Sequence, residues 1–298
     1  MPRALVIGAG AVGQVYARHL QKAGVEVCFF VKPKYAEEAR AGYTVYPLGE
    51  SREGKPFRFD GFGVVTSVEE VAAASWDQVW LCVSSPALRG DWLPPMLEAT
   101  RDATVVALTP GMDDLAYLGE RTRAERIVAG MIAFVAWQSP LPGETRDPPG
   151  IAYFFPPLQP SPFSGTDARV VPIVAALRAG GCPAKKVADA SAQGAVGSSI
   201  LLPLVAGLEA AGWSFAAFGR SPWLHTATAA AREALVIVAG KRGGSPAFVR
   251  HLVRPWTARL VLWAAPKLVP VNFEVYMKYH FTKVGDQTRQ VLGNLRGH

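Results

Sequence analysis

The sequence predicts an α/β protein, with a doubly wound parallel sheet in its N-terminal part and an all-helical C-terminal part. Up to residue 187, short runs that are apolar on both faces alternate with segments of helical period, as buried parallel strands and crossover helices do. From residue 188 onward, long segments of helical period replace the strands. We therefore expect two domains, residues 1–187 and 188–298.

The first elements form a β-α-β unit. The apolar run Ala4–Ile7 is a strand, the amphipathic stretch Val12–Leu20 is a helix that ends at Gly24, and Val25–Val31 is a second strand. Within a β-α-β unit of this order, a glycine-rich turn between the first strand and the helix indicates a dinucleotide-binding site.

The turn itself reads G-x-G-x-x-G. Gly8 permits a tight turn, Gly10 lets the backbone approach a pyrophosphate, and Gly13 lets the helix lie close to the strand. The helix N-terminus offers N–H groups to the phosphates. We expect a Rossmann-type dinucleotide site whose cofactor-binding residues include Gly8, Gly10, Ala11, Val12 and Gly13. The alternative is a strand-helix turn that binds no ligand.

The end of the second strand predicts which dinucleotide binds. An NAD site places Asp or Glu there to accept from the ribose hydroxyls. This chain has Lys32 and Lys34 instead, and Glu26 lies at the opposite end of the strand. Two lysines suit a 2′-phosphate, so we expect NADP(H) with Lys32 and Lys34 as ligands. The alternative is a pair of solvated surface lysines.

Further elements follow in both parts of the chain. We expect Phe57–Phe59 and Gly63–Thr66 to form a strand pair inserted after the second strand, and residues 139–164, which are rich in proline, to form turns and edge segments. The other expected strands are Val79–Val83, Thr104–Leu108, Arg126–Val135, Ile151–Phe155 and Pro183–Val187. The expected helices are Asp167–Ala179, Ala192–Gly212, Trp223–Gly240, Ala247–Trp263 and Asn272–Leu295.

Composition excludes several classes of protein. Half of the 298 residues are hydrophobic and 18% are charged, which excludes a disordered or fibrous chain. The net charge of +7 looks spread along the chain, and no run of five Lys or Arg marks a nucleic-acid partner. Three cysteines without a C-x-x-C pair indicate reduced thiols.

Hydropathy predicts a cytoplasmic protein without a membrane partner. The first strand begins at residue 4, which leaves no room for a signal peptide. The longest apolar stretch, Ile200–Ala211, is interrupted by Pro203 and Glu209 and falls short of the roughly 20 apolar residues that span a bilayer.

Several of these motifs resemble one family. The glycine turn, the basic residue Lys32, and the runs Leu81-Cys-Val-Ser-Ser85, Thr109-Pro-Gly-Met112 and Leu202-Pro-Leu204 make the chain similar to the ketopantoate reductase (2-dehydropantoate 2-reductase) family over nearly its full length. The resemblance implies an N-terminal NADP-binding Rossmann domain, a C-terminal helical domain for substrate binding or dimerisation, and an NADP-dependent oxidoreductase.

The departures from this family bear on the substrate. The resemblance implies a catalytic Lys and two Asn where this chain has Gly194 (or Gln193 in a shifted register), Ser198 and Leu202. It also implies Lys where the chain has Ser84 or Ser85, and Asn-Gly where it has Pro110-Gly111. Because the acid and its polar helpers are absent, ketopantoate itself is not the expected substrate.

The carboxyl ends of the fourth and fifth strands supply further cofactor candidates. Ser84 and Ser85 follow one strand, and Thr109 and Gly111 follow the next. Ligands of doubly wound sheets bind outside this edge, so we expect these four residues to contact the cofactor. The alternative for the serines is to cap the helix that begins near Pro86.

The C-terminal helix supplies candidates for the missing proton donor. Tyr276, His280, Lys283 and Gln287 follow at i, i+4, i+7 and i+11, which places them on one face. We expect His280 and Lys283 to be catalytic, and Tyr276, Gln287 and Ser198 to bind substrate. The alternative is a solvated helix flank, and for Ser198 a hydroxyl bonded back to its own helix.

Two function classes stay open. The first is an NADPH-dependent reductase that transfers hydride to a C=O or C=N bond of a small-molecule substrate. If the aromatic residues near Trp213 line the substrate pocket, this substrate is bulkier and more apolar than a small keto acid. The alternative for these residues is ordinary packing in the core. The second is a non-redox NADP(H)-binding regulator or scaffold that has lost the acid. A homodimer is compatible with either class, and no metal site is expected.

Overall fold

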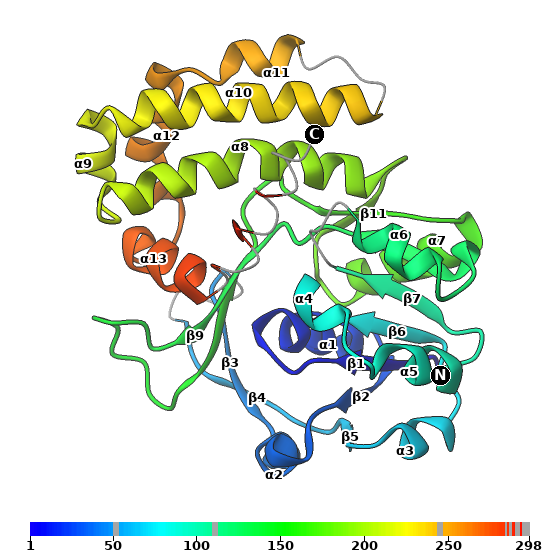
Figure 1. The fold of residues 1–298 in the computed structure, drawn as a ribbon. Helices are drawn as coiled ribbons and strands as arrows, with labels where there is room; N and C mark the ends of the chain where they lie inside the picture. The colour runs from blue at the N-terminus through cyan, green and yellow to red at the C-terminus, as the bar shows by residue number, and fades with distance from the viewer. Residues whose placement is uncertain are drawn as a thin grey trace. The chain divides into compact units, whose positions relative to one another are not determined.

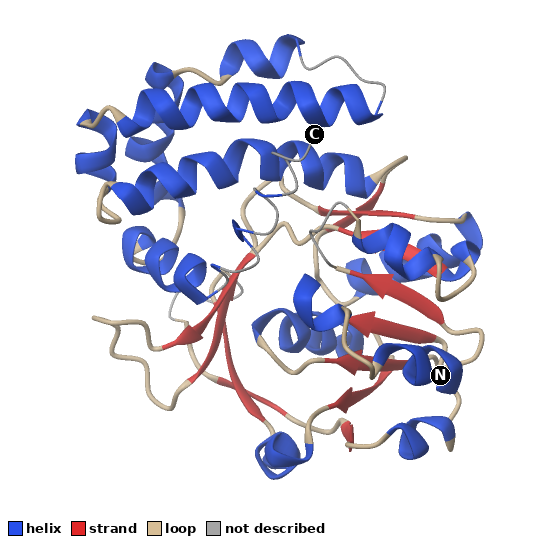
Figure 2. Cartoon of the chain, viewed as in Figure 1, coloured by secondary structure: helices blue, strands red, loops and turns tan. Residues whose placement is uncertain are grey.

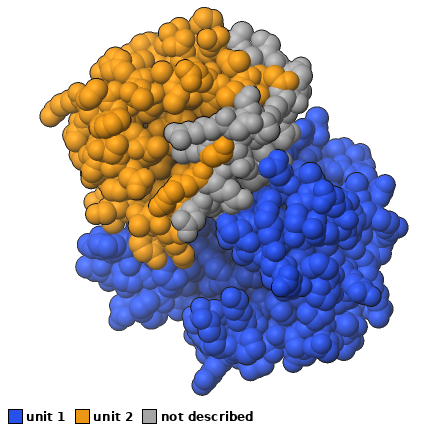
Figure 3. All heavy atoms as spheres, viewed as in Figure 1, with its two compact units in different colours: residues 1–191 blue, residues 192–298 orange. Residues whose placement is uncertain are grey.

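The computed structural model describes residues 1–49, 54–108, 113–242, 247–283, 285, 288, 289 and 293. The chain divides into two compact units, Met1–Ser191 and Ala192–His298, which are coloured separately in Figure 3. Their boundary lies four residues beyond the one expected from the sequence, at 187/188.

The first unit is built on a sheet that is parallel except at one pairing (Figures 1 and 2). Its strand order is β12-β11-β8-β7-β6-β1-β2-β5, and only β8 and β11 pair antiparallel. The expected α/β class with a doubly wound sheet is therefore confirmed. The strands are β1 (Arg3–Ile7), β2 (Glu26–Phe30), β5 (Gly63–Val65), β6 (Gln78–Leu81), β7 (Thr104–Ala107), β8 (Ile127–Gly130), β11 (Ser161–Ser164) and β12 (Ala184–Lys186).

The direction of winding reverses at β1. The chain proceeds from β1 to β2 and β5 on one side, then returns to β6 and continues to β7 and β8 on the other. The carboxyl ends of β1 and β6 therefore flank the topological switch point, where open α/β sheets bind ligands. The glycine turn follows β1 directly, and Cys82 to Ser84 follow β6.

Helices cover both faces of this sheet, as the alternation along β1 requires. Ala4 and Val6 pack on one side with α1 (Ala11–Lys22) and α7 (Asp167–Ala179), whereas Leu5 and Ile7 pack on the other with α5. The central strands β1, β2, β6 and β7 are apolar after their first residue because both faces of the sheet are buried. The remaining helices are α2 (Ala36–Ala41), α3 (Val68–Ala72), α4 (Ser85–Leu88), α5 (Leu93–Ala99) and α6 (Asp114–Gly119).

A second sheet corrects two expectations. Its order is β4 (Phe57–Phe59), β3 (Tyr43–Pro47), β10 (Gly150–Phe154) and β9 (Val135–Ser139). The expected pairing of Phe57–Phe59 with Gly63–Thr66 is wrong, because β4 pairs antiparallel with β3 whereas β5 pairs parallel with β2. The single strand expected over Arg126–Val135 is also wrong, because β8 ends at Gly130 and β9 begins in the other sheet.

Buried polar side chains on α1 join this second sheet to the first unit's core. His19 is fully buried, with Nδ1 2.7 Å from the carbonyl oxygen of Gly180 and Nε2 3.1 Å from the hydroxyl of Tyr153 on β10. Arg18 is buried beside it and donates to the same Tyr153 hydroxyl. One turn of α1 thus contacts both β10 and the turn after α7. These contacts give hydrogen-bond partners to buried polar groups, which would destabilise the folded state if they were unpaired.

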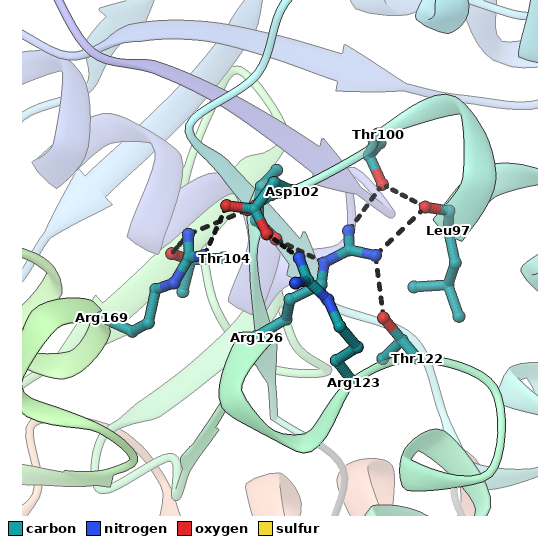
Figure 4. Close-up of polar contacts among 9 residues, drawn as sticks. Leu97, Thr100, Asp102, Thr104, Thr122, Arg123, Arg126 and Arg169 are labelled. Atoms are coloured by element: carbon teal, nitrogen blue, oxygen red, sulfur yellow. Dashed lines mark hydrogen bonds and ion pairs between the residues drawn. The ribbon is translucent and has the colours of Figure 1, made fainter.

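Charged residues close the opposite, amino edge of the main sheet (Figure 4). Asp102, just before β7, forms ion pairs with Arg123 and, at 2.7 Å, with Arg169 of α7. The hydrogen bond from Arg169 holds the pKa of the Asp102 carboxyl below its usual value. Arg126 is buried and donates to the carbonyl oxygen of Ala103 at 3.1 Å. A pocket of about 310 Å³ lies here, lined in part by Asp102 and Arg169, on the edge away from the glycine turn.

The second unit is helical throughout its described part, as expected. Its helices are α8 (Ala190–Ala210, which begins two residues before the unit boundary), α9 (Phe215–Arg220), α10 (Trp223–Arg242), α11 (Ala247–Leu252), α12 (Pro255–Leu268) and α13 (Phe273–Lys283). The single helix expected over Ala247–Trp263 is wrong. Arg254 precedes Pro255 and adopts extended backbone, with φ −132° and ψ 156°, because a proline disfavours the helical conformation of the residue before it.

One helix in the described part of the chain, α8, is long and apolar enough to cross a membrane by length and composition. It has 21 residues because it continues through Pro203 and begins well before Ile200, the start of the apolar stretch noted in the sequence. A core helix of a soluble protein meets the same criterion, so this is weak evidence for a membrane span.

The close approach of Gly180 to α1 gives a stability prediction. A methyl group on Gly180 would lie 1.8 Å from the carbonyl oxygen of His19. We expect Gly180→Ala to lower the free energy of unfolding by about 1–3 kcal/mol, the usual cost of overpacking. Gly197→Ala is the matched control, because nothing lies within 4 Å of a methyl group there and alanine favours the helix by up to about 1 kcal/mol. Chemical denaturation measures both, and equal stabilities would contradict this account.

Candidate functional site

The glycine turn after β1 has a geometry that only glycine accommodates at two positions. Gly8 has φ +100°, and a methyl group on it would lie 2.7 Å from the carbonyl oxygen of Cys82. A methyl group on Gly13 would lie 2.0 Å from the carbonyl oxygen of Gly8. The turn is therefore folded against the end of β6, and α1 approaches β1 as closely as the motif predicts.

Gly10 differs from these two residues because it faces open space. It is exposed, it immediately precedes α1, and nothing lies within 4 Å of a methyl group placed on it. The first intrahelical hydrogen bond runs from Gln14 N to Gly10 O at 2.9 Å. The N–H groups of Ala11, Val12 and Gly13 thus precede the first helical bond and have no carbonyl partner within α1, which is the donor set that holds a phosphate.

Gln14 is a residue of this turn that the sequence motif does not reveal. Its side chain is buried and donates from Nε2 to the carbonyl oxygen of Ala9 at 2.8 Å. Its Oε1 is buried without a hydrogen-bond partner among the described residues. The side chain fixes the carbonyl between Gly8 and Gly10, and so it helps to hold the turn in place. No sequence signal marks it, because the motif leaves this position unspecified.

Lys32 and Lys34 follow β2, as expected, and both are exposed. The Lys34 ammonium lies 4.8 Å from the centre of the Tyr35 ring. Among the described residues no carboxylate is ion-paired with either lysine, whereas Glu26 at the other end of β2 pairs with Arg3 at 2.8 Å. The carboxyl end of β2 therefore presents positive charge to solvent, and this charge attracts anions such as a phosphate.

The two serines after β6 occupy different environments. Ser84 is exposed and precedes α4 without capping it through its side chain. Ser85 is buried, and its hydroxyl donates to Asp114 Oδ2 at 2.6 Å. Arg89 Nη1 donates to the other Asp114 oxygen, also at 2.6 Å. Ser84 is thus the one of the pair whose hydroxyl faces solvent, and Ser85 helps to position Asp114.

Three predicted site residues, Thr109, Gly111 and Gln287, lie outside the described residues. The three cysteines are free thiols, and burial raises the pKa of Cys82, which follows β6, to about 12. The pKa of Cys28 rises to about 11 and that of Cys182 to about 12 for the same reason. They stay protonated near neutral pH and are unsuited to act as nucleophiles. The described residues contain no cluster of three or more potential metal ligands.

Comparison with known proteins identifies the family of this fold. Residues 4–146, which include both the glycine turn and Ser84, match the family model described as ketopantoate reductase PanE/ApbA. Residues 4–146 are therefore similar to this family in sequence, and they make up just under half of the chain. The resemblance stated from the sequence is therefore confirmed. No curated protein matches the sequence of the chain.

The fold of this chain matches solved structures over both units. A 2-dehydropantoate 2-reductase from Porphyromonas gingivalis has 16% identity and a TM-score of 0.66, covering 95% of this chain and 100% of its own. A 2-dehydropantoate 2-reductase from Geobacter metallireducens has 15% identity and a TM-score of 0.65, covering 99% of this chain and 99% of its own. A D-mandelate dehydrogenase, solved with NADH and anilino(oxo)acetate, has 13% identity and a TM-score of 0.65, covering 99% and 97%. At this identity the likeness shows the fold.

The positions at which the ketopantoate reductase resemblance implies a catalytic lysine and its helpers lie on α8. Gly194 and Ser198 are half-buried there, and Leu202 is buried. The neighbouring Ser199 bonds back to its own helix, with Oγ donating to Val196 O at 2.8 Å. These side chains leave α8 without an acid at the positions where the resemblance implies one.

Two residues of the predicted polar row on α13, Tyr276 and His280, belong to an aromatic stack. Tyr276 is buried, and its ring stacks on Phe273 at 5.9 Å and on His280 at 5.5 Å. Burial raises the pKa of the Tyr276 hydroxyl above its usual value. Lys283 is exposed, so the burial that would make it an acid is absent. Of the four residues, the described part of α13 brings Tyr276 and His280 together and leaves Lys283 in solvent.

His280 gives a pH prediction for the second unit. Burial, and secondly the charge of Lys283, lowers the pKa of His280 below its usual 6.5. As the pH falls through 6.5, His280 therefore becomes protonated in the unfolded chain before it does so in the folded one. Protonation favours the unfolded state, so the protein loses stability in this range.

We expect the melting temperature of the wild type to fall more than that of His280→Gln between about pH 7.5 and about pH 5.5. All other titrating groups are common to both proteins, so the difference isolates this imidazole. Parallel melting curves over that range would contradict the lowered pKa of His280.

Proposed function

We propose that the chain is an NADPH-dependent reductase that transfers hydride to a C=O or C=N bond of a substrate other than ketopantoate. The observation that carries the proposal is the glycine turn, where Gly8 and Gly13 tolerate no side chain and Gly10 opens onto unfilled space before α1. A dinucleotide, when bound, supplies the hydride, and the protein supplies the orientation and the electrostatics.

The preference for the phosphorylated cofactor rests on charge. Lys32 and Lys34 stand where an NAD-binding domain places a carboxylate for the ribose hydroxyls, and both are exposed. Two ammonium groups favour a 2′-phosphate over a free hydroxyl. The D-mandelate dehydrogenase of similar fold was solved with NADH, so the fold itself leaves the choice of cofactor to such side chains.

The substrate is the least specified part of the proposal. With Gly194, Ser198 and Leu202 in place of a lysine and two asparagines, α8 offers neither the acid nor the amides that a small keto acid would use. A less polar substrate needs fewer polar contacts from the protein, and an imine that already carries its proton needs no strong acid. His280 is the proton donor we propose from the second unit, with Tyr276, Ser198 and Gln287 as substrate contacts.

The compartment and partners belong to the same proposal. We propose a cytoplasmic enzyme, supported by three free thiols. Its partner is a small-molecule substrate rather than a nucleic acid.

The sharpest test of the cofactor site is Gly10→Ala. Apart from Gly10 and its two chain neighbours, no atom lies within 4 Å of the added methyl group, so we expect the variant to fold as the wild type does. The methyl group occupies the space through which a pyrophosphate approaches the backbone, so we expect the Kd for NADPH to rise at least about tenfold. Fluorescence titration measures binding, and a melting curve without ligand checks the fold.

Gly13→Ala is the matched comparison, because its methyl group would clash with Gly8 itself and destabilise the protein even without ligand. If Gly10→Ala bound NADPH as tightly as the wild type, the turn would not be the dinucleotide site.

The lysine pair is tested by cofactor selectivity. We expect Lys32→Ala/Lys34→Ala to weaken NADPH binding by about tenfold to a hundredfold, since it removes two charge-assisted contacts, and to leave NADH binding unchanged. Lys278→Ala, an exposed lysine of α13, is the control. Equal loss of both cofactors, or tighter binding of NADH by the wild type, would contradict the assignment.

Turnover separates the reductase from a regulator that has kept the fold. NADPH fluorescence is followed while ketones, keto acids and imines are supplied in turn. Oxidation with an apolar ketone or an imine supports the proposal. Tight NADPH binding without oxidation across the whole panel supports the non-redox alternative.

A further inference from the structure

The helix α12 carries a row of exposed apolar side chains. None of its 14 residues is buried. Trp256 and Trp263 are each 64% exposed and Leu260 is 55% exposed. With Lys267 they follow at i, i+4, i+7 and i+11, which places the four side chains on one face of the helix. We call these four residues the α12 row.

The net positive charge of the protein is concentrated in the segment of sequence that contains this row. Residues 234–273 contain six Lys or Arg and no Asp or Glu, whereas the other 258 residues contain 25 basic and 24 acidic ones. The expectation that the charge is spread along the chain is therefore wrong. Arg250 on α11 and Arg259 on α12 are both exposed within this acid-free segment. The Lys267 ammonium lies 3.3 Å from the centre of the Trp263 ring.

This combination matches the chemistry of an anionic lipid surface. Tryptophan rings place an apolar body and a polar edge at the boundary between headgroups and acyl chains, and basic side chains pair with the headgroups. Lys267 can extend its ammonium toward the headgroups while its stem stays beside Trp263. At 14 residues, or about 21 Å, α12 is too short to span a bilayer and suits a position in its surface.

A second copy of the chain fits the α12 row less well. A two-fold symmetric interface brings the same patch of both subunits together, so the acid-free segment would face itself. Arg259 and Lys267 would then meet like charges without a carboxylate from the same segment to pair with.

We propose that α12 is a peripheral membrane-binding helix that recognises anionic lipid through Trp256, Leu260, Trp263 and the basic residues around them. The inference is independent of the reductase activity. It replaces the expectation of no membrane partner with reversible attachment to a surface.

The test uses the full chain and vesicles of phosphatidylcholine, alone or with phosphatidylglycerol. We expect sedimentation with the phosphatidylglycerol vesicles at least about tenfold stronger than with phosphatidylcholine alone, and a loss of most of this binding in about 0.5 M salt. Trp256→Ala/Trp263→Ala lowers the binding at least about tenfold. Leu158→Ala, which removes a 99% exposed leucine of the first unit, leaves it unchanged.

A second pair of measurements does not depend on the tryptophan variant. Arg250→Gln/Lys267→Gln changes two exposed cations and weakens binding to the anionic vesicles several-fold, with a smaller effect on phosphatidylcholine. Brominated lipid quenches tryptophan fluorescence of the wild type on contact. Circular dichroism and melting curves confirm that each variant is folded.

Three results would overturn the proposal. The wild type could bind both kinds of vesicle equally or neither, or the tryptophan variant could bind as the wild type does. Light scattering could instead show a wild-type dimer that the tryptophan variant converts to monomers without vesicle binding by either, which would make the α12 row a subunit interface.

Discussion

The close approach of α1 to β1 is the constraint on which the rest of the first unit depends. It exists because Gly13 has no side chain to meet the carbonyl of Gly8, and because Gly8 adopts a backbone conformation that leaves room for the carbonyl of Cys82. This contact fixes the helix over the switch point between β1 and β6. It also aims the unpaired N–H groups at the start of α1 toward the carboxyl edge of the sheet, where a phosphate can reach them.

Local pattern predicted the elements better than their partners. The central strands of the main sheet were found because burial on both faces makes them largely apolar, and α7 was predicted with its observed bounds. The edge strand β11 was missed, because its sequence has no such apolar run. Partners were missed because pairing is a non-local property: β4 and β5 lie four residues apart in sequence yet belong to different sheets. The break before α12 was readable in principle, since Pro255 restricts the residue before it.

In the candidate site, too, local features were predicted from the sequence and contacts between distant residues were not. Its glycine turn and the lysines after β2 sit within one β-α-β unit, so their spacing alone predicted them. The environment of Ser85 depends on Asp114, 29 residues away, and no local pattern shows that a buried carboxylate takes its hydroxyl. On α13, helical spacing correctly grouped Tyr276 with His280 but could not show that their rings stack and that Tyr276 is buried.

The buried contacts of His19 have a consequence for the whole first unit. The helix whose first turn presents donors to a ligand is the helix whose third turn touches Tyr153 on β10 and the carbonyl of Gly180. Both contacts belong to one helix. A ligand that binds the first turn of α1 more tightly when β10 is in place would therefore also stabilise the second sheet, and loosening of β10 would weaken the binding of that ligand by the same free energy.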